Sequence, residues 1–102
     1  LDDWSPDTPG GLDCDSYAMA KLRKLLALGW PISFLRLACC YVETGEYHAI
    51  LVVRTDQQEL ALDNRQDHPC RMEELQRIGY RPDRIQAAGG SRDWCKWTWE
   101  EA

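Results

Sequence analysis

The chain has 102 residues, a formal net charge of −5 and a hydrophobic content of 44%. This length suits one domain, so we expect residues 1–102 to form a single domain. The negative charge and the lack of a Lys/Arg cluster argue against binding to nucleic acid, and no apolar run reaches the roughly 20 residues that insert across a bilayer. No signal peptide is visible, although a start at Leu1 leaves room for a removed upstream segment.

A loop and then a helix are predicted at the start of the chain. Residues 1–12 are rich in Asp, Ser, Pro and Gly, which favour turns, so they are expected to be a loop that leads into the domain. Apolar residues then recur at steps of three and four, and Gly29 supplies a stop signal. This pattern predicts a helix over residues 14–28. Asp13 suits the N-cap, which places Cys14 in the first turn.

The middle of the chain is predicted to be an antiparallel sheet. Its β-rich or alternating segments, separated by polar turns, are Phe34–Val42, Tyr47–Arg54 and Glu59–Asp63. A helix is then expected over Met72–Ile78. A strand near Arg84–Ala87, a turn at Gly89–Gly90 and a closing strand over Trp94–Trp99 complete the chain.

Two registers are open for the hairpin that carries His48 and Asp63. A turn at residues 55–56 sets His48 directly opposite Asp63. A turn at residues 56–57 offsets the two residues by two positions. Both registers leave the two side chains on one face of the sheet, because side chains alternate along a strand with a period of two.

The five cysteines are an odd number, so at least one thiol is not paired within the chain. Cys39 and Cys40 are neighbours on a predicted strand and point to opposite faces, which argues against a redox pair. With Cys70 and Cys95 they are expected to be buried, reduced thiols, which favours a cytoplasmic location. Cys14 is the exception because of its place at a helix start.

Cys14, His48 and Asp63 lie in the order of a cysteine protease or acyl-transfer site, each on a different predicted element. The positive end of a helix dipole favours a thiolate, a histidine can take the thiol proton, and a carboxylate can orient that histidine. The fold expected from these elements is α+β, with the N-terminal helix that carries the Cys packed on an antiparallel sheet that carries the His and the Asp. The other histidine, His68, is expected to be a loop residue.

Three segments of the chain resemble the bacterial transglutaminase-like cysteine proteinases, a family within the transglutaminase/papain-like group. They are residues 13–21, 47–52 and 62–64, which read DCDSYAMAK, YHAILV and LDN. The resemblance covers roughly residues 1–80. It implies a papain-like core and a bacterial or phage origin.

The resemblance also implies a role for each candidate residue. Cys14 would be the nucleophile, His48 the general base and then the general acid, and Asp63 the residue that orients His48. The implied activity is that of a cysteine endopeptidase, which hydrolyses a peptide bond of a protein or peptide substrate through a thioester acyl-enzyme. Members of the family include calcium-dependent periplasmic enzymes, so the resemblance favours the periplasm.

Calcium is the one cofactor that the resemblance suggests. Asp13 and Asp15 match acidic positions beside the family's Cys, but Ser16 replaces a further acidic residue, so one oxygen ligand is missing. Capping and the helix dipole explain both carboxylates without a metal, and we favour that explanation.

Two alternatives to the peptidase stay open. An amide or acyl transferase would use the same three residues with an amine as the second nucleophile. A protein-binding module would keep the fold but have weak or no turnover. Two features favour it: Ser16 replaces an acidic residue of the family, and only 13 residues precede Cys14, where the family has a longer region. The sequence does not indicate the substrate, the cleavage site, the oxyanion-hole donors or the oligomeric state.

Overall fold

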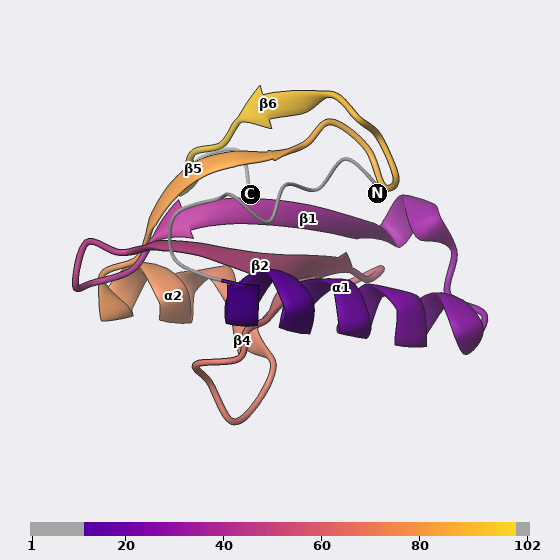
Figure 1. Cartoon of the computed structure of the whole chain (residues 1–102), viewed down its shortest axis with the longest axis horizontal. Helices are drawn as coiled ribbons and strands as arrows, with labels where there is room; N and C mark the ends of the chain where they lie inside the picture. Colours follow the sequence, from indigo (N-terminus) through magenta and orange to yellow (C-terminus); the bar gives the residue numbers. More distant parts are fainter. Residues whose placement is uncertain (1–11, 100–102) are drawn as a thin grey trace.

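The computed structural model describes residues 12–99, with the side chains described from residue 16 onward. It confirms the α+β class, with two α-helices and a six-stranded antiparallel sheet of strand order β4-β3-β2-β1-β5-β6 (Figure 1). The predicted loop over residues 1–12 lies outside the described part, except that its last residue already begins the first helix. Neither of the described α-helices is long and apolar enough to cross a membrane.

The elements follow the predicted order with small changes at their ends. They are α1 (Leu12–Ala27), a 3-10 turn (Ile32–Phe34), β1 (Leu35–Tyr41), β2 (Tyr47–Arg54), β3 (Glu59–Leu62), β4 (Cys70–Arg71), α2 (Met72–Ile78), β5 (Arg81–Gln86) and β6 (Trp94–Lys96). The bounds predicted for β2 and α2 are confirmed. Strand β4, which has two residues, was not predicted.

The last strand is shorter than predicted because two tryptophans leave it to enter the core. Strand β6 ends at Lys96, and Trp97 is then 96% buried. The rings of Trp97 and Trp99 meet edge to face with their centroids 5.5 Å apart. The backbone N–H of Trp97 still donates to the carbonyl oxygen of Asp83 at 3.0 Å, so the chain stays beside β5 while the Trp97 ring packs in the core.

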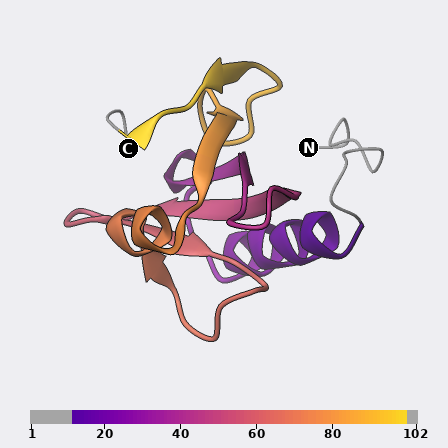
Figure 2. The same ribbon diagram turned by 90° about the vertical axis from the view of Figure 1, so that its left-hand side faces the viewer.

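The two helices cover opposite faces of the sheet (Figure 2). On one face α1 contributes to a cluster that we call the α1 cluster, made of Ala18, Leu22, Leu35, Leu37, Leu51 and Val53. The other face carries the α2 cluster, whose buried members include Ala38, Cys40, Ile50, Val52, Met72, Leu75 and Tyr80. The period of two along β1 and β2 separates these sets, because odd-numbered residues face α1 and even-numbered residues face α2.

The β2–β3 hairpin has the second of the two predicted registers. Arg54 pairs with Glu59, and the backbone N–H of Thr55 donates to the carbonyl oxygen of Gln58 at 2.8 Å, so residues 56–57 form the turn. The Thr55 hydroxyl closes this turn because its Oγ1 accepts the backbone N–H of Gln58 at 3.1 Å. The first register, which placed the turn one residue earlier, is therefore wrong.

The cysteines follow the predicted burial with one exception. Cys39, Cys40 and Cys70 are buried, and alternation along β1 points the first two to opposite faces, as predicted. Cys95 is exposed, so its predicted burial is wrong. It lies in β6, a three-residue strand at the edge of the sheet, which pairs only with β5.

Candidate functional site

A histidine and an aspartate form a buried hydrogen-bonded pair between β2 and the end of β3. Nε2 of His48 lies 2.6 Å from Oδ1 of Asp63, and the two residues are 5% and 2% exposed. His48 is the second residue of β2, and Asp63 follows the last residue of β3. The structure therefore brings together two of the three residues that the sequence singled out.

Three hydrogen bonds hold the carboxylate of Asp63 in its ionised form. Besides His48, the Tyr80 hydroxyl donates to Oδ2 at 2.6 Å, and the backbone N–H of Arg65 donates to Oδ1 at 3.0 Å. Burial by itself raises the pKa of Asp63, but these hydrogen bonds outweigh it, and the pKa lies below its ordinary value. Asp63 is therefore an anion at neutral pH, inside the protein.

The proton arrangement on His48 follows from that charge. Because an ionised carboxylate only accepts hydrogen bonds, Nε2 of His48 carries the proton of the 2.6 Å contact. Nδ1 is the other ring nitrogen, and no described residue hydrogen-bonds to it. The Tyr80 ring stands nearly perpendicular to the imidazole, at 87° and with centroids 6.1 Å apart, which restricts the imidazole orientation. Nδ1 is thus the atom that can accept a proton from a nucleophile.

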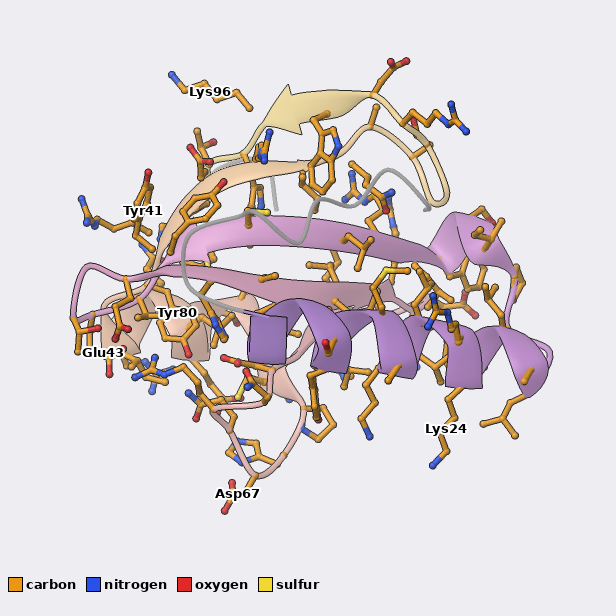
Figure 3. The ribbon with its side chains drawn as sticks, viewed as in Figure 1. Lys24, Tyr41, Glu43, Asp67, Tyr80 and Lys96 are labelled. Atoms are coloured by element: carbon orange, nitrogen blue, oxygen red, sulfur yellow. The ribbon has the colours of Figure 1, made fainter. Side chains whose placement is uncertain are left out.

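A second layer of polar residues supports Tyr80 and Asp63. Arg65 donates to both carboxylate oxygens of Glu43 at 2.8 Å and to the Tyr80 hydroxyl at 2.9 Å. The hydrogen bond from Arg65 lowers the pKa of Glu43 to about 2. Burial, followed by the hydrogen bond to Asp63, raises the pKa of Tyr80 above its ordinary value, so its hydroxyl stays a donor. Figure 3 shows Glu43 and Tyr80 near each other at one end of the sheet.

The sequence analysis missed Tyr80, Arg65 and Glu43, because they come from three separate segments. The αL conformation of Gly79, with φ of 108°, ends α2 and turns the chain so that Tyr80 enters the core. A buried tyrosine needs a partner for its hydroxyl, which is the signal that a sequence offers, but only the fold shows that the partner is Asp63.

Cys14 lies in the first turn of α1, where the sequence predicted it. Its side chain falls outside the described part, as do those of Asp13 and Asp15, the calcium ligands suggested by the resemblance. Helix α1 packs through Ala18 and other apolar residues on the odd-numbered face of β2, whereas the ring of His48 lies on the even-numbered face. The structure thus joins His48 to Asp63, and it places the backbone of Cys14 but not the thiol.

The structure also has an open polar cleft of about 860 Å³ at the other end of β2. Its lining includes Arg54, Glu59, Arg71 and Glu73. His48 lies six residues before Arg54, which is about 20 Å along an extended strand, so this cleft is separate from the His48–Asp63 pair.

A model of a known protein family matches the chain. The family model described as "Bacterial transglutaminase-like cysteine proteinase BTLCP" matches residues 1–101, which is essentially the whole chain and more than the 1–80 expected from the motifs. Searches of curated proteins and of solved structures found no match.

Proposed function

The chain belongs to the bacterial transglutaminase-like cysteine proteinase family, and on this premise we propose that it is a cysteine endopeptidase. It hydrolyses a peptide bond of a protein substrate with Cys14 as the nucleophile, His48 as the general base and acid, and Asp63 as the residue that orients His48. The observation that carries the proposal is the buried 2.6 Å contact between His48 and Asp63. This contact gives a general base what it needs, because the ionised carboxylate holds the imidazole in one tautomer and one orientation.

The reaction has two halves, and in each half the imidazole accepts one proton from the attacking group and then donates it to the leaving group. Nδ1 of His48 takes the thiol proton as Cys14 Sγ attacks the substrate carbonyl carbon. The imidazolium then gives that proton to the leaving amine, which leaves a thioester on Cys14. Water attacks the thioester while Nδ1 takes a proton from it, and the imidazolium returns that proton to Sγ of Cys14 as the C–S bond breaks and the carboxylic acid product forms. Asp63 holds Nε2–H throughout and stabilises the positive charge that appears on the ring.

The place of Cys14 in α1 supports its role. The helix has 16 residues, and its first turn presents unpaired backbone N–H groups and the positive end of the dipole, which favour a thiolate. Asp13 and Asp15, proposed as calcium ligands from the family resemblance, lie in this same turn, and assays with calcium and with a chelator test them.

The decisive experiment measures the coupling between Cys14 and His48, because α1 and the His48 ring lie on opposite faces of the sheet. We would follow iodoacetamide labelling of Cys14 against pH by peptide mass spectrometry, in a Cys95→Ser background that removes the exposed thiol. His48→Ala is compared with His68→Ala, the matched change at the other histidine, which is exposed.

The proposal expects labelling at pH 6 that is lost in His48→Ala and kept in His68→Ala. If labelling rises only near pH 8–9, where an ordinary thiol ionises, and if His48→Ala leaves it unchanged, the Cys–His pair does not exist. The protein-binding alternative, a module without turnover, would then take its place.

Acyl transfer is the other outcome that the same three residues allow. A thioester can pass its acyl group to an amine instead of water, and the two reactions share every step up to that point. Product analysis with and without an added primary amine distinguishes hydrolysis from acyl transfer, because only a transferase forms an amide bond between the acyl group and the amine.

A further inference from the structure

Three side chains with metal-binding atoms meet beside α2, on the side of the loop that follows Asp63. Nε2 of His68 lies 3.7 Å from Sγ of Cys70 and 3.2 Å from Oε2 of Glu74. All three atoms lie within 4.8 Å of one another, and no other such group of His, Cys, Asp and Glu occurs in the part of the chain with described side chains. We propose that His68, Cys70 and Glu74 bind one zinc ion.

The separations are those of zinc ligands. Zinc sites are tetrahedral, with Zn–S near 2.3 Å and Zn–N or Zn–O near 2.0–2.1 Å, so adjacent ligand atoms lie about 3.3–3.6 Å apart. The two contacts of His68 Nε2, at 3.7 Å to Cys70 and 3.2 Å to Glu74, are close to these values. A carboxylate oxygen of Glu74 also lies within 4.8 Å of Sγ of Cys70. Imidazole, thiolate and carboxylate are all common zinc ligands.

Two of the three ligands are already oriented by other groups of the protein. Nδ1 of His68 contacts Oδ1 of Asp67 at 2.7 Å, which turns Nε2 toward Cys70 and Glu74. A carboxylate behind a histidine ligand is the usual support of a zinc site. Oε1 of Glu74 accepts the backbone N–H of Arg71 at 3.0 Å, so Oε2 is left for a metal. Figure 3 shows Asp67 at the outer tip of the loop.

Two carboxylates beside His68 favour a cation at this position, because Asp67 contacts Nδ1 at 2.7 Å and Glu74 contacts Nε2 at 3.2 Å. A zinc ion would displace the thiol proton of Cys70, and any proton on Nε2 of His68, into solvent as the Zn–S and Zn–N bonds form. The three protein ligands leave a fourth position for water, and the ion would tie the loop from Asp63 to Cys70 onto α2.

The first test is a Co²⁺ titration of the full chain with Cys14→Ala and Cys95→Ser, so that neither the proposed nucleophile nor the exposed thiol can bind the ion. We expect thiolate-to-cobalt charge-transfer absorption in the near ultraviolet that saturates at one equivalent. This band reports on Cys70, because Cys39 and Cys40 belong to no group of metal-binding side chains in the part of the chain with described side chains. A missing band would overturn the proposal, and it would leave the peptidase proposal untouched.

The second test measures Zn²⁺ affinity by competition with a chromophoric chelator in the same background. His68→Ala should weaken binding about 100-fold, and Asp67→Asn, which loosens the support of His68, about tenfold. Glu74→Gln should weaken it as well, whereas Glu73→Gln, the same change at the exposed neighbouring residue, should leave it within about twofold. Equal affinities in His68→Ala and Glu73→Gln would overturn the site.

Discussion

His48 and Asp63 form their hydrogen bond although they do not face each other directly across the hairpin. The register pairs Leu51 with Leu62, so Asp63 is offset by two residues from the position opposite His48. A diagonal pair on one face lies within reach of a long or aromatic side chain, and the imidazole spans the offset to reach Oδ1 at 2.6 Å.

The first prediction concerns the ionised carboxylate of Asp63, which accepts the hydrogen bond of His48. Asp63→Asn keeps the shape of the side chain but removes the charge that stabilises the imidazolium, so we expect labelling of Cys14 at pH 6 to slow by at least about tenfold, which is one pKa unit. Asp67→Asn is the matched control, because Asp67 contacts the exposed His68 in the same way. Equal rates in the two variants would show that Asp63 does not act on Cys14.

The second prediction concerns the Tyr80 hydroxyl. Tyr80→Phe removes the 2.6 Å hydrogen bond to Asp63 and leaves a buried carboxylate oxygen with one donor fewer, so the free energy of unfolding should fall by about 1–3 kcal/mol. Urea denaturation measures this change. Tyr41→Phe, at a ring that is 37% exposed, is the control and should change stability by less than about 0.5 kcal/mol. A Tyr80→Phe chain as stable as the control would contradict the prediction.

The third prediction is a pH dependence with a defined sign. The pKa of Asp63 is lower in the folded chain than the value of about 3.9 in an unfolded one, so the unfolded state binds the proton more readily. The stability that Asp63 supplies is therefore complete above pH 4 and is lost as the pH falls through the folded pKa. Urea unfolding between pH 5 and pH 2 should show a steeper loss in the wild type than in Asp63→Asn. Asp56→Asn, in the exposed turn, should lose unfolding free energy with falling pH as steeply as the wild type does. Equal pH dependence of the unfolding free energy in all three chains would show that Asp63 does not contribute to it.

The fourth prediction concerns the docking of α1. Leu22 is 99% buried among Leu37, Leu51 and other residues of the α1 cluster, so Leu22→Ala should lower the free energy of unfolding by about 2–5 kcal/mol. Leu28→Ala makes the same change just beyond the helix, at a residue that is 69% exposed, and should cost less than about 0.5 kcal/mol. Similar losses in the two variants, measured by urea denaturation, would mean that α1 does not pack as the structure shows.

The sequence by itself determined the local elements and the shared face of His48 and Asp63. Periods of two and of 3.6 residues depend only on the chain geometry, so they located β2 and α2 to the residue and placed both side chains on one face in either register. The family was also identifiable from the three motifs, and the family model that matches residues 1–101 confirms it.

The tertiary structure alone decided the register, the support of Asp63 and the face that α1 covers. The two registers of the hairpin share their hydrophobic pattern, and the hydrogen bonds of Thr55 within the turn select between them. Tyr80 reaches Asp63 only because α2 ends at Gly79 and the chain then turns into β5. Helix α1 has an apolar side that fits either face of a sheet. The face it covers is set by packing between residues far apart in the chain, and the local hydrophobic pattern does not predict such packing.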